Sequence, residues 1–271
     1  MKERNENMTL VTTKRDDEGI VTMTLNAPDT RNAISDLPMI EAILEALTKT
    51  QADPEARVIV LTGAGPAFSS GGNIKSMSPG QGLVDEVPAI TRRNYRAGIQ
   101  RLPLAFEDCD LPIVAAVNGP AVGAGCDLTL MCDLRIAGAS AKFAESFVRI
   151  GIVPGDGGAW LLPRVVGFAR ASEMALTGDM IDAETAKDYG LVSQVVPDED
   201  LMEAARALAG RIAANPRHAV RMTRRLLRQA YNRDLSVTLE LSSAMQALAH
   251  ETEDYASALA SMRARIKKST S

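Results

Sequence analysis

Residues 112–128, with the sequence PIVAAVNGPAVGAGCDL, hold the pattern that decides the fold. The run Pro112–Val117 is short and almost wholly apolar, as expected for a strand buried on both faces, which is typical of parallel sheets. Asn118-Gly-Pro ends this run, and the glycines that follow let the backbone turn with φ > 0 and leave N–H groups free. Residues Ala124–Cys132 then read as a helix whose positive N-terminal end lies at this turn.

The chain on either side repeats this alternation. Further strands are predicted over Ile20–Leu25, Arg57–Thr62, Leu134–Ala137 and Val192–Pro197, with helices over Asp36–Gln51 and Ala89–Glu107. Short apolar strands that alternate with helices predict a layered α/β fold. From about Ala169 the pattern becomes nearly all helical. We therefore predict a core over residues 1–195 and a helical region over residues 196–271.

Composition excludes several classes of protein. The 271 residues contain 30 Lys and Arg against 34 Asp and Glu, a net charge of −4 that argues against a general nucleic-acid binder. The most apolar stretch, Leu111–Cys126, is interrupted by Pro and Gly, so we expect no membrane span. The polar N-terminus has no signal-peptide pattern, and the 3 Cys are too few and too unevenly placed for a disulfide framework, which favours a cytoplasmic protein with reduced thiols. With only 2 His in the chain, a Ser-His-Asp triad or a metal site is not expected.

A second glycine-rich turn, Gly65–Lys75, also follows a predicted strand. Two such turns facing each other would form an oxyanion hole, a pair of backbone N–H groups that binds a developing negative charge. Asp127 would lie beside it, in the first turn of the helix. An Asp in this place is also a favourable partner for the helix dipole without any catalytic role.

Several segments, in this order, resemble the crotonase superfamily, also called the enoyl-CoA hydratase/isomerase family. The resemblance runs from about Ile20 to the C-terminus. Its motifs are the Pro28…Arg31-Asn32-Ala33 turn, residues 67–75 (AFSSGGNIK), residues 118–128 (NGPAVGAGCDL), residues 151–158 (GIVPGDGG) and residues 162–164 (LPR).

The resemblance implies a crotonase-like spiral of ββα units, followed by a helical C-terminal region through which copies form a trimer or a dimer of trimers. It also implies an acyl-CoA thioester as the substrate, so that coenzyme A arrives with the substrate and no cofactor is bound permanently. The thioester carbonyl would lie between the N–H groups of Gly72 and Ala124. Residues that would hold the coenzyme A portion are Arg31, Ser70, Gly72, Asn73, Ile74 and Arg263.

The departures from the family pattern concern its acids. Hydratases of the family use two glutamates to hold and activate water; the first position is Asp127 here, and the second is Phe147. Asp156 and Glu145 are the nearby carboxyl groups that could replace the missing acid. On a strand, Glu145 would point to the same face as Phe147, whereas on a helix the two would diverge.

With one family acid retained, the sequence favours double-bond isomerisation, because one base can take a proton from one carbon and return it to another. In this hypothesis Asp127 is the base. Two alternatives stay open: hydration of a 2-enoyl-CoA, and binding of an acyl-CoA without catalysis. Trp160, Phe147 and Met77 are candidates for the lining of the acyl pocket, which residues 76–100 should cover.

Overall fold

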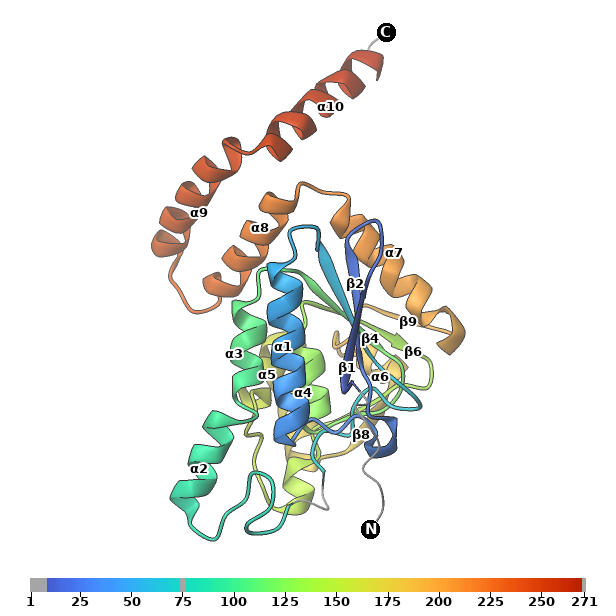
Figure 1. The fold of residues 1–271 in the computed structure, drawn as a ribbon, viewed down its shortest axis with the longest axis vertical. Helices are drawn as coiled ribbons and strands as arrows, with labels where there is room; N and C mark the ends of the chain where they lie inside the picture. Colours follow the sequence, from blue (N-terminus) through green and yellow to red (C-terminus); the bar gives the residue numbers. More distant parts are fainter. Residues whose placement is uncertain (1–8, 74–76, 270–271) are drawn as a thin grey trace.

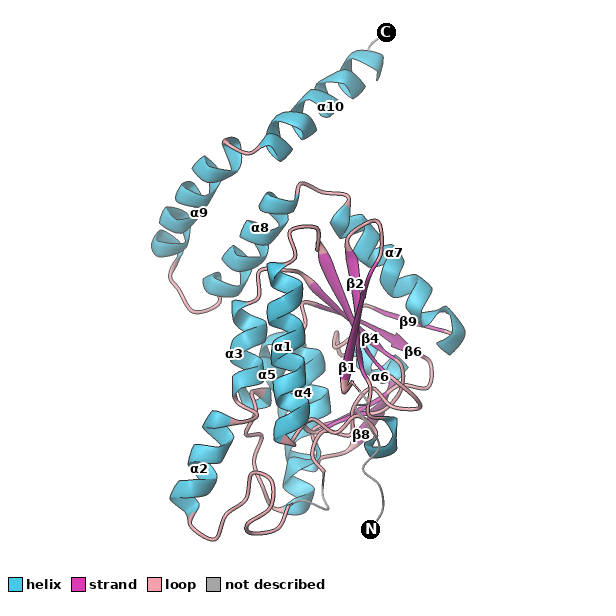
Figure 2. Ribbon diagram, viewed as in Figure 1, coloured by secondary structure: helices cyan, strands magenta, loops and turns pink. Residues whose placement is uncertain are grey.

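The computed structural model describes residues 9–73 and 77–269 of the chain. Its main sheet has six strands in the order β1-β2-β3-β4-β6-β9, all parallel except β1, which runs antiparallel to β2. The strands are β1 (Val11–Arg15), β2 (Ile20–Leu25), β3 (Val58–Gly63), β4 (Ile113–Val117), β6 (Leu134–Gly138) and β9 (Gln194–Val196). A smaller sheet contains β5 (Ala121–Val122), β7 (Lys142–Ala144) and β8 (Met180–Asp182). The predicted α/β class is confirmed (Figure 2).

Helices cover both faces of the main sheet (Figure 1). They are α1 (Leu37–Ala52), α2 (Pro88–Ala97), α3 (Arg101–Asp108), α4 (Ala124–Met131), α5 (Gly158–Thr177), α6 (Ala183–Asp188), α7 (Leu201–Ala213), α8 (Arg217–Ala230), α9 (Leu235–His250) and α10 (Glu253–Ser269). Short 3-10 turns span Pro28–Thr30, Ser146–Ile150 and Asp198–Asp200.

The alternation of side chains along the central strands explains the two layers. Every residue of β3 and β4 is buried, and successive side chains point to opposite faces. Val58 and Val60 of β3 belong to the core cluster that contains buried residues of α7, whereas Ile59 and Leu61 belong to the larger cluster on the side of α1, α3 and α4. The wholly apolar strands are thus buried by helices on both sides, as the sequence predicted.

Two helix predictions need correction. The helix predicted over Ala89–Glu107 is two helices, because the backbone leaves the helical conformation at Gly98 (φ −107°, ψ −112°). Helix α5 begins at Gly158, about ten residues before the point where the sequence pattern turned helical. The predicted helical region over residues 196–271 contains α7 to α10, but α7 packs on the main sheet. The division at residue 195 stays a prediction.

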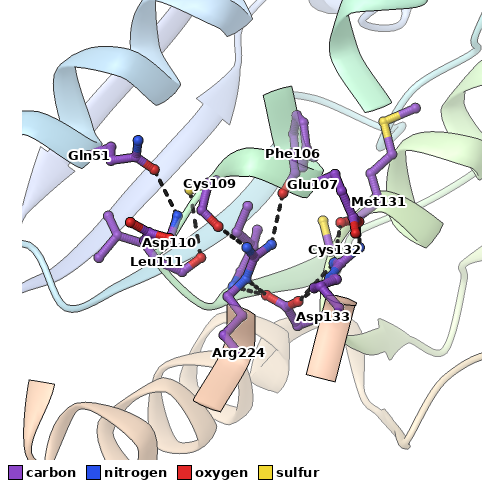
Figure 3. A network of polar contacts seen from close by, with 12 residues as sticks. Gln51, Phe106, Glu107, Cys109, Asp110, Leu111, Met131, Cys132, Asp133 and Arg224 are labelled. Atoms are coloured by element: carbon purple, nitrogen blue, oxygen red, sulfur yellow. Dashed lines mark hydrogen bonds and ion pairs between the residues drawn. The ribbon is translucent and has the colours of Figure 1, made fainter. Parts of the chain in front are cut away.

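Helix α8 is fixed to the core by a network of charged groups (Figure 3). The Arg224 guanidinium pairs with Asp133 at 2.8 Å and donates to the carbonyl oxygens of Phe106, at 2.9 Å, and Cys109. Arg228 pairs with the same Asp133 at 2.8 Å, and the other Asp133 oxygen accepts from the backbone N–H of Ile113. The network therefore joins α8 to the ends of α3 and α4 and to the start of β4.

Replacing Arg224 by Met is expected to lower the free energy of unfolding by about 3–5 kcal/mol, because it removes one of the cations that pair with Asp133 and the donor to the carbonyl oxygens of Phe106 and Cys109. The Arg224 side chain is only 5% exposed. Its neighbour Arg225 makes an exposed pair with Asp110, with side chains 47% and 38% exposed, so Arg225→Met should cost less than about 1 kcal/mol. Urea denaturation of both variants measures the difference. Equal losses would contradict a special role for the buried pair.

Helix α10 projects away from the rest of the molecule, whereas α9 lies beside α8 (Figure 1), and no residue of α9 is buried. Both carry exposed apolar side chains: Leu235, Val237, Leu239, Leu248, Met262 and Ile266. Within the described part of the chain, no helix has an apolar stretch long enough to cross a membrane.

Candidate active site

Two asparagine side chains hold the glycine-rich turn after β3. The Asn32 side chain accepts from Ala27 N–H and donates to the carbonyl oxygens of Ala64 and Ala67, each at 2.9 Å. Asn118, at the end of β4, accepts from Gly63 N–H at 3.1 Å and donates to the carbonyl oxygen of Gly65 at 3.0 Å. The turns after β2, β3 and β4 are thereby tied together.

The two turns predicted to face each other are in direct backbone contact. Ser69 pairs with Ala121 as an isolated bridge, with its N–H donating to Pro120 and its carbonyl accepting from Val122 N–H at 3.0 Å. A Cβ built on Gly71 would overlap the Val122 carbonyl oxygen and stand 2.8 Å from the Ala124 nitrogen. The structure therefore places the Gly71-Gly72 segment beside the first residue of α4, which is the arrangement that an oxyanion hole from Gly72 and Ala124 requires.

Two predicted pocket residues stand around this contact. The terminal methyl group of Met77 lies against Gly72, where a Cβ would overlap it. Phe147, partly buried, lies beside Gly123, with its ring 3.6 Å from the place of a Cβ there. The position that carries the second family acid is thus an apolar ring next to the N-terminus of α4.

Three carboxyl side chains converge next to α4. Asp127 is 0% exposed, Glu145 is 1% exposed and Asp156 is 3% exposed. A Cβ on Gly158, the first residue of α5, would overlap an Asp127 oxygen, so the lack of a side chain at Gly158 makes the room for this carboxyl group. With all three groups ionised, no described N–H or O–H group donates to either oxygen of Asp127 or of Glu145, or to Oδ1 of Asp156, whereas a protonated Asp127 is placed to donate to Glu145 and to Asp156.

Burial raises the pKa of all three groups. The pKa of Asp127 is raised well above its usual range, first by desolvation and then by the charges of Glu145 and Asp156. Desolvation likewise raises the pKa of Asp156 and brings the pKa of Glu145 to about 7. The three groups therefore titrate as one unit, and Asp127, which faces both of the others, is the member that most strongly retains a proton.

The raised pKa of Glu145 predicts a pH-dependent stability. Between pH 4.5 and about 7 the folded chain keeps a proton that the unfolded chain has released, so stability falls as pH rises over this range and the loss is complete above about pH 7. Glu145→Gln carries no charge and avoids this loss. The stability difference between the variant and the wild type should therefore shift by on the order of 3 kcal/mol in favour of the variant from pH 5 to pH 8.

Urea denaturation at several pH values measures this shift. The exposed Glu199→Gln is the matched control, and its profile should run parallel to that of the wild type. A parallel profile for Glu145→Gln as well would show that Glu145 has no raised pKa.

The residues predicted to hold coenzyme A fall into three groups. Arg31 and Ser70 are adjacent, since the Ser70 N–H donates to the Arg31 carbonyl oxygen at 2.8 Å, and the Asn73 N–H donates to Ser35 Oγ at 3.0 Å. Ile74 lies outside the described residues. Arg263 lies on α10, which projects away from the core, so one chain does not bring it to Arg31.

Sequence reasoning missed two residues of the site, and Trp160, a candidate for the acyl pocket, lies apart from the carboxyl cluster. Gly158 went unnoticed because only the fold shows that Asp127 needs its space. Tyr95 of α2 lies over Gly155, with Cε1 2.9 Å from the place of a Cβ there. Trp160 stacks on Arg164, whose Cζ lies 3.9 Å from the ring centroid, in a groove of about 770 Å³ between α5 and α8 that none of the three carboxyl groups lines. The sequence did give one indication of Tyr95, because it lies within residues 76–100, which were expected to cover the acyl pocket.

Comparison with known proteins agrees with this arrangement. The family model described as enoyl-CoA hydratase/isomerase matches residues 15–267. The chain is 36% identical over 241 residues to 1,2-epoxyphenylacetyl-CoA isomerase of Escherichia coli, covering 88% of this chain and 90% of that protein. It is 37% identical over 238 residues to a probable enoyl-CoA hydratase of Rhodobacter capsulatus, covering 88% and 89%.

Solved structures show the same fold. An enoyl-CoA hydratase from Bacillus anthracis superposes with a TM-score of 0.86 at 32% identity, covering 94% of this chain and 96% of that one. A putative enoyl-CoA hydratase/isomerase from Mycobacterium abscessus gives a TM-score of 0.84, also at 32% identity, covering 94% and 96%. The predicted crotonase-like fold is confirmed. From the family model, the relatives and the shared fold together, the chain is a member of the enoyl-CoA hydratase/isomerase family of enzymes.

Proposed function

We propose that the chain isomerises a double bond in the acyl group of a coenzyme A thioester through an enolate. The observation that carries this proposal is the cluster of Asp127, Glu145 and Asp156, buried together beside the contact between Gly71 and Ala124. The cluster supplies proton acceptors and donors, and the two backbone N–H groups supply the place for a negative oxygen.

The chemistry balances without any added reagent. A carboxylate takes a proton from a carbon next to the double bond, and the electron pair moves onto the thioester oxygen between Gly72 and Ala124. The proton then returns at the other end of the three-carbon unit, and the double bond shifts by one position. Such a hole is worth about 2.7–4 kcal/mol per donor in transition-state stabilisation.

Within the cluster, Asp127 is closest in the chain to the hole and is our proposed base. Because Asp127 most strongly retains a proton, it must first pass that proton to Glu145 or Asp156 before it can act as the base. These neighbours are the only described acceptors that face it, so the cluster acts as one acid–base unit. No group of three His, Cys, Asp or Glu side chains in the described ranges is arranged to hold a metal ion.

Burial and the ring of Phe147 favour isomerisation over hydration. Hydration needs a water molecule held between two carboxylates near the thioester. Here an apolar ring lies beside Gly123, and the three carboxyl groups are almost completely buried. Hydration is the second candidate, because several relatives are named enoyl-CoA hydratases and because Glu145 or Asp156 can replace the missing acid.

We also propose that α9 and α10 assemble copies of the chain into a trimer, since large apolar side chains such as Leu235, Leu239 and Met262 are exposed on them in the single chain. In that assembly Arg263 of one copy could reach the acyl-CoA of the next. Sedimentation of the wild type and of Leu239→Asp tests this: the variant should sediment as a smaller species.

The reaction is tested by incubating trans-2-, trans-3- and saturated acyl-CoAs with the enzyme in D₂O and following deuterium uptake by mass spectrometry. We expect exchange at the thioester α-carbon and interconversion of the 2- and 3-enoyl isomers. Rapid water addition to crotonyl-CoA, with kcat of about 1–10³ s⁻¹ and no isomerisation, would identify a hydratase instead. Tight binding without exchange would identify an acyl-CoA-binding protein.

A further inference from the structure

The groove between α5 and α8 is mostly apolar and open to solvent. Its walls include Trp160, Leu161 and Val165 from α5 and Ala219, Val220 and Leu227 from α8. Much of this surface is exposed in the single chain, since Leu227 is 66% exposed and Tyr231, just after α8, is 60% exposed. Ligand pockets bury most of a small molecule, whereas a broad exposed apolar surface is typical of a contact with another protein.

The guanidinium group of Arg164 in this groove has no anionic partner in the described part of the chain. It stacks on the ring of Trp160 and donates to the Trp160 carbonyl oxygen at 2.8 Å, while its Nε is enclosed without an acceptor. The guanidinium groups of Arg224 and Arg228, by contrast, both pair with Asp133. An occupant of the groove is therefore expected to bring a carboxylate together with apolar side chains.

Helix α9 presents such a surface to the outside. One face of α9 packs on α8, but none of its residues is buried and none lines the groove. With about 3.6 residues per turn, Glu240 stands near the centre of the outward face, and it makes no ion pair with another described residue. The large apolar side chains on the two flanks of this face, which are 43–73% exposed, are Leu235 and Leu239 on one flank and Val237 and Leu248 on the other.

A single chain does not bring these two surfaces together. The outward face of α9 points away from α8, whereas α8 itself forms one wall of the groove. The two surfaces can therefore meet only between two copies. Each copy then offers one groove and one α9, so the contact is heterologous, and contacts of this kind give a closed ring when the rotation between copies closes. A trimer is such a ring.

We propose that the groove between α5 and α8 receives α9 of a second copy of the chain, with Glu240 of one copy beside Arg164 of the next. The inference rests on the proposed assembly through α9 and α10 and identifies the surface that receives α9. Trp160 in the groove comes two residues after Gly158, which makes the room for Asp127. The start of α5 thus lies between the subunit contact and the carboxyl cluster.

Sedimentation velocity tests the apolar part of this contact. Leu227→Asp places a charge in the groove and should raise the dissociation constant of the assembly at least about thirtyfold. Leu176→Asp is the matched control, because Leu176 also lies on α5 and is 76% exposed but does not line the groove. We expect the wild type and Leu176→Asp to sediment as trimers, and Leu227→Asp and Leu239→Asp as smaller species. Circular dichroism should show the same helix content in all four.

Exchange of the two charges tests the pairing of Glu240 with Arg164. Arg164→Glu and Glu240→Arg each bring like charges together, so each should weaken the assembly about tenfold or more at low salt. A chain with both substitutions restores opposite charges across every contact and should recover most of the loss. A loss caused only by local disturbance of α5 or α9 would add up in the double variant instead.

The proposal is overturned if Leu227→Asp stays assembled while Leu239→Asp dissociates, because α9 would then bind another surface and the groove would be open to a different occupant. The proposed assembly through α9 and α10 would stand in that case. A wild type that sediments as a monomer overturns both. A double charge variant that does not recover overturns the placement of Glu240 beside Arg164.

Discussion

Replacing Asp127 by Asn is expected to lower deuterium exchange at the thioester α-carbon by about 10²–10⁴-fold, the usual contribution of a positioned acid or base. The amide has nearly the same size and shape as the carboxyl group, so it fits against Gly158 without new overlap. It cannot accept a proton from carbon. The loss should therefore appear in kcat, with little change in KM, because the residues expected to hold coenzyme A lie in other parts of the chain.

The variant should also stay folded. With its three acids ionised, the wild type has no described N–H or O–H group that donates to the Asp127 oxygens, and the acids crowd one buried space. An amide at this position offers N–H donors to Glu145 and Asp156, which relieves both the repulsion and the lack of partners. We expect an unchanged or raised melting temperature together with the loss of exchange.

Asp108→Asn, an exposed change on α3, is the control and should leave the rate unaltered. Exchange that survives Asp127→Asn would move the base to another member of the cluster. Glu145→Gln and Asp156→Asn in the same assay would then show which one. If exchange is lost in Asp127→Asn but not in the other two variants, the result would support Asp127 as the base.

The contact between the two glycine-rich turns could be predicted from the sequence because each turn is a local feature. A buried strand followed by Asn118 and a run of glycines needs no long-range information to read as a tight turn into a helix, and the resemblance to a known family gave the partner turn. The strands at Ile20–Leu25, Arg57–Thr62 and Pro112–Val117 appear within one residue of their predicted bounds. Their apolar character on both faces is enough to identify them.

The carboxyl cluster could not be predicted in the same way, because its members come from three separate segments. Glu145 is buried because the chain leaves β7 at Ala144 and enters a 3-10 turn, which separates the direction of Glu145 from that of Phe147. The sequence did not decide whether residues 145–147 form a strand or a helix, and this conformation determines whether Glu145 faces Asp127. Asp156 reaches the cluster through a turn that contains Gly157 at φ 120°.

The position of Tyr95 depends on a break between α2 and α3 that helix propensity does not reveal. Residues 88–108 have a continuous helical pattern, and only the reversal at Gly98 brings α2 over the loop of Gly155. A Cβ at Gly98 would stand 2.7 Å from the Asn94 carbonyl oxygen, so the glycine is needed for the close approach at this turn. Tertiary contacts, rather than the helix propensity of the segment, thus determine where α2 lies.

Replacing Gly71 by Ala should remove nearly all activity by pushing apart the two turns that form the hole. Gly71 has φ 73°, and its Cβ would overlap the Val122 carbonyl oxygen and lie 2.8 Å from the Ala124 nitrogen. These are backbone atoms at the start of α4, so no side chain can rotate away to make room. We expect a loss in kcat of at least about 10²–10³-fold, comparable to the loss of one donor of an oxyanion hole.

Two other glycines separate the possible causes of this loss. Gly80 has φ 79° with no atom within 4 Å of its Cβ, so Gly80→Ala introduces the strain of a positive φ, about 1–3 kcal/mol, without a clash. At Gly72, a Cβ would meet only the mobile end of Met77, so Gly72→Ala should keep its N–H in place and most of the activity. Deuterium exchange and thermal unfolding of the three variants measure these effects. If Gly71→Ala is no worse than Gly80→Ala, strain alone explains it, and the close approach of Gly71 to Ala124 does not set the geometry of the hole.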